Sequence, residues 1–298
     1  MKILLAEFAV GAGVEEFMPE GMAMLRTLAR SFTGCGHEVH YPTTGALLDT
    51  GIPVKSTDFE ESLAEISKEC DAGLVVAPDE ILGDLTEIIE KNTENLGCPP
   101  DSVRLCADKL KCTRILGRNN IPVPETISEG TYRGDYVVKP GFGCASENIF
   151  RSSSGRLGEG FIATRFIDGE HLSVSIITGK TQLPLTVNRQ LIEINKNVSY
   201  KGGIVPCHSE REAELIEIAE KTASILGCRG YAGIDIVLAG KPYVVDVNPR
   251  PTSSIIGVAK VLDMEIADLI LSSRFGELPA SVGTNGSFTF RKKELLRL

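Results

Sequence analysis

Residues 233–238 read GIDIVL, and residues 243–250 read YVVDVNPR after a short turn. Both segments are apolar and rich in β-branched residues, so they predict two strands, and the four residues between them predict a hairpin loop. With a loop of that length, Asp235 is expected to face Asp246 across the strand pair. Side chains two positions apart on a strand share a face, so Asn248 joins the two carboxylates.

This group of oxygen ligands indicates a metal site. Two carboxylates that face one another repel unless a cation lies between them. Asp235, Asp246 and Asn248 suit Mg²⁺, with Mn²⁺ as an alternative, and phosphate oxygens and water would complete the coordination. Arg250 follows the second strand, where its guanidinium can reach a phosphate or a developing oxyanion. The alternative is a solvated hairpin without a metal; the apolar flanks favour the metal site.

A second segment has the features of a phosphate-binding loop. Residues 135–140 (DYVVKP) predict a strand that ends near Lys139, and the loop GFGCAS follows. Small residues let backbone N–H groups approach phosphate oxygens closely. A lysine at a strand end is common on protein surfaces, and only its combination with the acid hairpin favours a nucleotide site. Lys109, in the first turn of a helix expected at 107–120, is a second candidate. The loop positions expected at the phosphates are Gly141, Gly143 and Ser146.

The segment after the next strand, 161–167, is the candidate hinge of the nucleotide site. Its sequence continues as Asp168-Gly169-Glu170. A hinge between two lobes offers backbone N–H and C=O groups to an adenine ring, and Glu170 can accept hydrogen bonds from ribose hydroxyls. The alternative is an ordinary turn with solvated acids.

The order of predicted elements defines the fold class. Up to residue 97, strands alternate with helices, which predicts a small parallel sheet with helices on both faces and ligands beyond the carboxyl ends of its strands. Residues 98–100 (CPP) suggest a linker. From residue 135 onward short strands dominate, interrupted by a helix at 212–226 and followed by one at 255–271. The sequence therefore predicts an α/β domain followed by an α+β region.

Composition limits the possible functions. The chain of 298 residues carries a formal net charge of −9, which argues against a nucleic-acid partner. It contains no apolar run long enough to span a membrane and no export signal at its start, so we expect a cytoplasmic protein. The eight cysteines are dispersed without a CxxC pair, which argues against zinc and for reduced thiols. A homodimer is only the commonest default.

Together these segments resemble the ATP-grasp superfamily. The matching stretches are ADKLKCTRILGRNNIPVPET, YVVKPGFGCAS, FIDGEHLSVSII, GYAGIDIVL and VVDVNPRPTSS. The resemblance implies an α/β pre-ATP-grasp domain at 1–99, a small lobe at 100–165 and a C-terminal lobe at 166–298, the two lobes clamping ATP. By the same resemblance, the lysines contact ATP phosphates and Glu170 the ribose, the backbone near Phe166 and Ile167 holds adenine, and the acid pair with Asn248 binds Mg²⁺.

The resemblance also implies a reaction. ATP-grasp ligases join a carboxylate to an amine through an acyl phosphate and release ADP and phosphate; here Lys139 and Arg250 would be the catalytic residues. The stretches PEGMAML, VNRQLIEI and YKGGIVPC are similar to archaeal ligases of methanofuran biosynthesis, which implies L-glutamate and tyramine as substrates. Alternatives are another amine such as an amino acid, a small-molecule kinase, and a nucleotide sensor. The candidate substrate-binding residues are Glu20, Arg189 and Lys201, each of which has an ordinary surface or helix-start role as its alternative.

Overall fold

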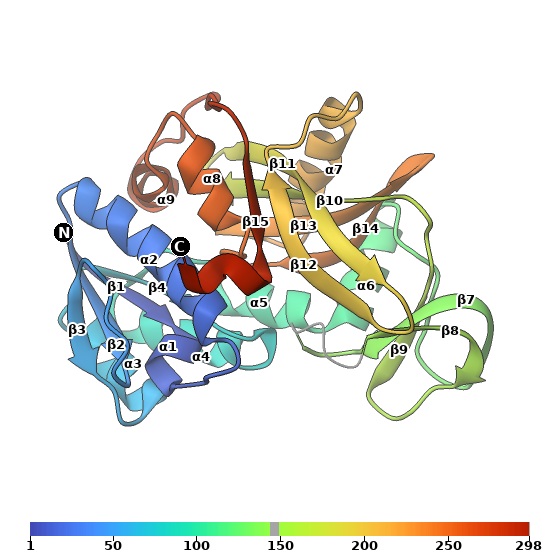
Figure 1. The fold of residues 1–298 in the computed structure, drawn as a ribbon, viewed down its shortest axis with the longest axis horizontal. Helices are drawn as coiled ribbons and strands as arrows, with labels where there is room; N and C mark the ends of the chain where they lie inside the picture. Colours follow the sequence, from blue (N-terminus) through green and yellow to red (C-terminus); the bar gives the residue numbers. More distant parts are fainter. Residues whose placement is uncertain (144–148, 298) are drawn as a thin grey trace.

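The computed structural model describes residues 1–143 and 149–297, which form three sheets (Figure 1). The first is a five-stranded parallel sheet of order β3-β2-β1-β4-β5. Strands β3 and β5 were not predicted, because they are short edge strands without a continuous apolar run. The strands are β1 (Lys2–Glu7), β2 (Glu38–Thr43), β3 (Ile52–Lys55), β4 (Ala72–Val76) and β5 (Glu94–Asn95).

Helices cover both faces of this sheet, as predicted. Ile3 and Leu5 of β1 belong to the same core cluster as α2, whereas Leu4 and Ala6 pack with α3 and α4 on the opposite face. Successive side chains of a strand point to opposite faces, so β1 contributes to both layers. The helices of this part are α1 (Phe8–Ala12), α2 (Met18–Gly34), α3 (Phe59–Ser67) and α4 (Asp79–Asn92).

Two helices then lead into a four-stranded antiparallel sheet of order β6-β9-β7-β8. The linker expected at 98–100 was wrong in part, because Pro100 opens helix α5, a position at which proline loses no hydrogen bond. Asp108 caps α6 by accepting a hydrogen bond from the backbone N–H of Lys111 at 2.9 Å. The elements are α5 (Pro100–Ala107), α6 (Lys109–Arg118), β6 (Thr126–Ile127), β7 (Thr131–Pro140), β8 (Phe150–Arg156) and β9 (Phe161–Arg165).

The third sheet is antiparallel, with six strands in the order β14-β13-β10-β11-β12-β15. The α/β part followed by an α+β part is thus confirmed. The strands are β10 (Glu170–Thr178), β11 (Gln182–Ile194), β12 (Val198–Val205), β13 (Gly230–Ala239), β14 (Lys241–Asn248) and β15 (Phe288–Arg291). The helices of this region are α7 (Glu212–Ile225), α8 (Ile255–Val261), α9 (Ile266–Phe275) and the 3₁₀ helix η1 (Lys292–Arg297).

The single helix expected at 255–271 was wrong. The chain leaves the helical conformation at Leu262, which forms an isolated bridge with Thr284, and the N–H of Asp263 donates to the carbonyl of Gly283 at 3.0 Å. The carboxylate of Asp263 in turn accepts from the N–H of Gly283 at 2.9 Å. Pairing with this distant segment, which helical periodicity does not report, divides the helix into α8 and α9.

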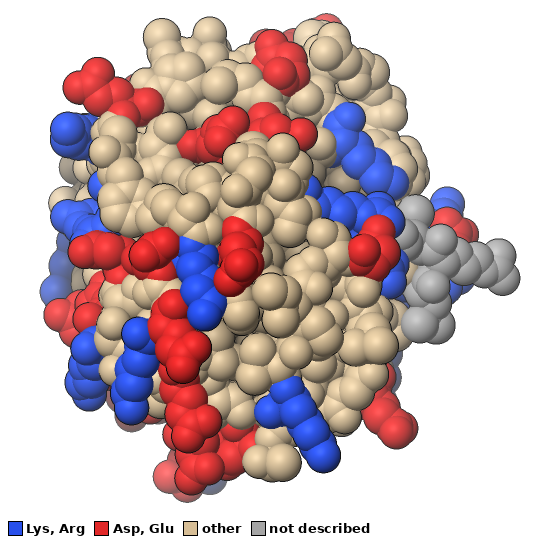
Figure 2. All heavy atoms as spheres, turned by 90° about the vertical axis from the view of Figure 1, so that its left-hand side faces the viewer, with Lys and Arg blue, Asp and Glu red and all other residues tan. Residues whose placement is uncertain are grey.

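Helix α2 joins the N-terminal sheet to the rest of the molecule. Its buried residues share one core cluster with α8 and α9, which lie beside it in Figure 1. The Ser31 hydroxyl donates to Glu265 at 2.6 Å and accepts from the N–H of Ala267 at 3.1 Å, which fixes α2 against the start of α9. Figure 2 shows the side of the molecule at the left of Figure 1, where acidic and basic side chains are both present among uncharged ones.

The hairpin that carries the acid pair turns more tightly than expected. Ala239 pairs with Lys241, so only Gly240 lies between them, in the left-handed conformation with φ 66°. Continued without interruption, this register would place Asp235 opposite Val245. A β-bulge at that point leaves Val245 without a partner in β13 and restores the pairing of Asp235 with Asp246. The predicted pair is therefore confirmed, although the predicted four-residue loop was wrong.

Candidate active site

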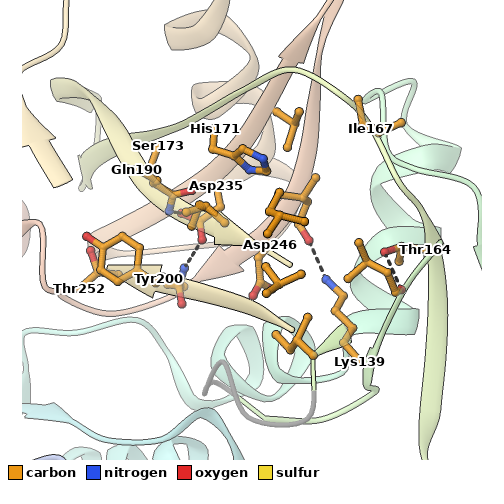
Figure 3. A pocket seen from close by; sticks show the side chains of 18 of the residues that line it. Lys139, Thr164, Ile167, His171, Ser173, Gln190, Tyr200, Asp235, Asp246 and Thr252 are labelled. Carbon is orange, nitrogen blue, oxygen red and sulfur yellow. Dashed lines mark hydrogen bonds between the residues drawn. The ribbon is translucent and has the colours of Figure 1, made fainter. Parts of the chain in front are cut away.

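A cavity of about 290 Å³ lies between the four-stranded and six-stranded sheets (Figure 3). Lys139 and Thr164 reach it from the four-stranded sheet, and Asp235 and Asp246 reach it from the hairpin of the six-stranded sheet. Figure 3 shows Asp235 and Asp246 between two ends of the cavity, with Tyr200 and Thr252 at one end and Lys139, Thr164 and Ile167 at the other.

The environment of Asp235 fits a bound cation. Its Oδ1 accepts from Gln190 Nε2 at 2.9 Å and its Oδ2 from Asn248 Nδ2 at 3.4 Å. Burial, together with the facing charge of Asp246, raises the pKa of Asp235 to about 7. A cation beside both carboxylates would favour their ionised forms. Among residues 1–143 and 149–297, no three His, Cys, Asp or Glu side chains group as metal ligands, so two carboxylates and an amide make up the candidate site.

Two lysines surround the second carboxylate. Lys109 Nζ lies 2.9 Å from both Oδ1 and Oδ2 of Asp246, and Lys139 Nζ donates to the bulged carbonyl of Val245 at 3.0 Å. Burial alone would raise the pKa of Asp246, but the charges of the two lysines outweigh it and lower that pKa. Burial lowers the pKa of Lys139, against the opposing effect of Asp246. The two predicted phosphate lysines and the predicted metal ligand therefore lie in one network.

The loop after β7 is anchored at its start. The carbonyl of Gly141 accepts from the N–H of Lys109 at 2.9 Å, and the N–H of Gly141 donates to Gly160 at 2.7 Å. Gly143 has φ 121°, a conformation that favours glycine, and its nearest side-chain neighbour is the carboxylate end of Glu80. Ser146 lies outside the described residues. The first part of the loop thus fixes the position of Lys109.

The predicted hinge residues line the cavity, whereas the predicted ribose residue Glu170 and the predicted substrate residues Arg189 and Lys201 do not. Phe166 and Ile167 are part of the lining, and the N–H of Phe166 donates to the Asp135 carbonyl at 2.8 Å. The three side chains outside the lining are exposed and form ion pairs: Glu170 with Arg189 at 2.7 Å, and Lys201 with Glu193 at 3.1 Å. Their proposed contacts with ribose or substrate therefore have no support from this geometry.

Helices α2 and α4 of the N-terminal part contact the cavity residues through two ion pairs. Arg250 lines the cavity and its Nε lies 3.2 Å from Oδ1 of Asp79, which is buried at the start of α4. Glu20 also lines the cavity, and its Oε2 lies 2.7 Å from Nζ of Lys292. Sequence reasoning missed Lys292 and Gln190; each is an ordinary polar residue of its strand or helix, and only the folded chain brings it to the cavity.

Comparison with known proteins identifies the class of this fold. Residues 106–254 match the family model described as an ATP-grasp domain. The chain belongs to the ATP-grasp family.

Two curated relatives extend the similarity over nearly the whole chain. The tyramine–L-glutamate ligase of Methanocaldococcus fervens is 30% identical over 92% of this chain and 94% of its own length. The ligase of that name from Methanocaldococcus jannaschii is 29% identical, covering 92% and 90%. The protein is an ATP-dependent carboxylate–amine ligase that forms C–N bonds.

Solved structures agree with the fold. A crystal structure titled as a putative ATP-grasp superfamily protein from Archaeoglobus fulgidus has a TM-score of 0.80 and 28% identity, with 98% of both chains covered. The L-amino acid ligase of Bacillus licheniformis has a TM-score of 0.67 at 16% identity, covering 94% of this chain and 77% of that one, which supports the fold alone. No helix in the described part of the chain is long and apolar enough to cross a membrane.

Proposed function

We propose that this ligase joins the γ-carboxylate of L-glutamate to the amine of tyramine through an acyl phosphate, with release of ADP and phosphate. The main support is the cavity between two sheets that Lys139, Asp235, Asp246 and Arg250 line, with Lys109 paired to Asp246 outside the lining. The choice of substrates rests on the similarity to the two tyramine–L-glutamate ligases.

The basic residues would bind phosphate, and the acidic residues would bind the metal ion. Lys139 and Lys109 would hold phosphate oxygens of ATP, and their buried positions make each charge effective. Asp235, Asp246 and Asn248 would hold Mg²⁺ or Mn²⁺, which when bound supplies positive charge to the phosphates and fixes their orientation. Phe166 and Ile167 would contact adenine at the opposite end from Tyr200.

The reaction would proceed in two displacements. A substrate carboxylate oxygen attacks the γ-phosphorus, the bond from that phosphorus to the β–γ bridging oxygen breaks, and ADP leaves. The amine nitrogen then attacks the acyl carbon, loses a proton, and phosphate departs with the former carboxylate oxygen. The tetrahedral oxyanion of this second step would be stabilised by Arg250, whose guanidinium is oriented by Asp79.

The decisive experiment is ADP release from Mg-ATP with glutamate, with and without tyramine. We expect ADP only when both substrates are present, and a product whose mass equals their sum less one water. ADP with glutamate and another amine would leave the ligase class intact and overturn tyramine. Phosphorylation of a substrate without any amine would indicate a small-molecule kinase.

Isotope transfer tests whether the reaction passes through an acyl phosphate. Glutamate labelled with ¹⁸O in the γ-carboxylate should transfer one label to the released phosphate, because that oxygen leaves with phosphorus. Released phosphate without label would rule out this intermediate while leaving the products unchanged.

A further inference from the structure

The cavity contains a charged pair that the proposed mechanism leaves without a role. Glu20 comes from α2 near the start of the chain, and Lys292 comes from η1 near its end. Their Oε2 and Nζ lie 2.7 Å apart, and both residues line the cavity. Nζ of Lys292 also lies 5.6 Å from the centroid of the Tyr200 ring. The pair therefore belongs to the Tyr200 end of the cavity.

The Tyr200 end of the cavity and the proposed nucleotide end lie on opposite sides of the acid pair, Asp235 and Asp246. Tyr200 and Thr252 lie on one side of Asp235 in Figure 3, and Lys139 and Ile167 lie on the other. A carboxylate that attacks a phosphate held near the acids must approach from the side that the nucleotide does not occupy. The acid substrate would consequently extend from the acids toward Glu20 and Lys292.

Glu20 and Lys292 can give up their contact with one another and bind the charged groups of a suitable ligand instead. The side chains of Glu20 and Lys292 are 23% and 38% exposed, and ion pairs with this much exposure to water contribute little to stability. A ligand that carries an ammonium and a carboxylate on one carbon would give each side chain an opposite charge again. A ligand with only one of these charges would leave either Glu20 or Lys292 without a partner.

We infer that Glu20 and Lys292 separate to bind the α-ammonium and the α-carboxylate of a free amino acid, whose side-chain carboxylate then reaches the acid pair. The inference rests on the ligase function proposed above and deepens it, because it makes the acid substrate an α-amino acid attached by its side chain. Lys292 is a substrate-binding residue in this arrangement, and Tyr200 is a positioning residue beneath its ammonium.

Two truncated analogues test the two charges separately. Glutarate is glutamate without the α-ammonium, and 4-aminobutyrate is glutamate without the α-carboxylate; both keep the carboxylate that reacts. We expect the unmodified enzyme to prefer glutamate to either analogue by about tenfold or more in kcat/KM, since each lost contact is a charged hydrogen bond.

Substitution of Lys292 or Glu20 should remove the preference for glutamate over one analogue and leave the preference over the other. Lys292→Met should abolish the preference over 4-aminobutyrate and keep that over glutarate, whereas Glu20→Gln should do the reverse. The matched controls are Lys293→Met and Glu16→Gln, whose side chains are exposed and outside the cavity; both should keep both preferences. If Lys292→Met and Glu20→Gln lower thermal stability but keep both preferences, the pair only ties α2 to η1 and the inference is wrong.

Binding measurements separate this inference from the choice of glutamate and tyramine. The common L-amino acids are titrated calorimetrically into the unmodified protein with a non-hydrolysable ATP analogue and Mg²⁺. Binding of an acidic amino acid that Lys292→Met weakens about tenfold would support the inference even if glutamate and tyramine give no product. Binding of none of them, or binding that Lys292→Met leaves unchanged, would overturn it even if the ligase activity is confirmed.

Discussion

Lys109 Nζ lies 2.9 Å from both carboxylate oxygens of Asp246, a residue 137 positions further along the chain. The contact joins the first turn of α6 to the hairpin that carries the acid pair. It pairs the Lys109 ammonium, a proposed phosphate ligand, with the Asp246 carboxylate, a proposed metal ligand. Each group favours the charged form of the other in the absence of ATP and metal. Loss of either charge should therefore affect both ligand sites.

Asp246→Asn should reduce ATP turnover by about 100-fold or more, because it removes one proposed metal ligand and the anion that orients Lys109. Steady-state ADP release at saturating Mg-ATP measures this effect. Asp101→Asn, whose side chain is fully exposed, is the control and should retain activity. An Asp246→Asn enzyme with nearly normal turnover would remove this residue from the site.

Lys139→Met should lose activity without losing stability. The ammonium is buried and burial lowers its pKa, so relief from desolvating this charge offsets the loss of its hydrogen bond to the Val245 carbonyl, and a methionine of similar length can fill the space. We expect a free energy of unfolding within about 1 kcal/mol of the original and a large fall in kcat, measured by urea denaturation and ADP release. The exposed Lys180→Met should change neither quantity. Equal losses of stability and activity would instead indicate a structural role.

Stability without metal should depend on pH through Asp235. Its pKa is about 7 in the fold and near 4 when unfolded, so the folded protein binds the extra proton between these values. The free energy of unfolding should fall as pH rises through this window, and Asp235→Asn should make the dependence shallower. Denaturation in EDTA from pH 5 to 8 tests this.

Buried Glu7, whose pKa burial also raises to about 7, will leave a residual dependence that Glu7→Gln removes. Asp101→Asn should leave the dependence unchanged. An Asp235→Asn profile identical to the original would show that Asp235 is ionised throughout the window.

Arg250→Met should destabilise the protein by about 3 kcal/mol, because it takes the paired guanidinium from the buried carboxylate of Asp79. Combining it with Asp79→Asn should restore most of that stability, since the uncompensated charge is gone. Activity should stay low in the double variant, because the proposed oxyanion stabiliser is still absent. Thermal unfolding and ADP release separate the two effects, and recovered activity would place Arg250 outside the chemistry.

The sequence predicts those features that repeat locally. Alternating apolar strands and helices gave the parallel sheet, and side-chain alternation placed Asp246 and Asn248 on one face. Asp235 was placed opposite Asp246 by an assumed four-residue loop, and the pairing holds only because a bulge compensates for the shorter turn. Lys109 and Lys139 were each ambiguous alone, and the structure shows both beside Asp246. The sheet and the fold class are confirmed because strand and helix periods are properties of neighbouring residues, whereas the roles of these residues at ATP and metal remain proposals.

Features that depend on distant segments were not predictable. The break between α8 and α9 requires the pairing of Leu262 with Thr284, and Lys292 acquires a partner only where the chain end meets α2. Cysteines that are dispersed along the sequence are likewise gathered in one buried core cluster: Cys70, Cys98, Cys106, Cys112 and Cys228.

The bulge at Val245, and not the length of the turn, determines what the hairpin contributes to the cavity. A one-residue turn with a bulge and a four-residue loop without one both place Asp235 opposite Asp246, but the bulged form leaves the Val245 carbonyl outside the β13 pairing to hold Lys139. A single insertion at Gly240 can lengthen the turn to two residues and leave this register unchanged. Deletion of Val245 would keep the two acids opposite one another in a regular ladder and remove the carbonyl that Lys139 binds. The position of the lysine is therefore coupled to the strand irregularity, whereas the turn itself is free to vary in length.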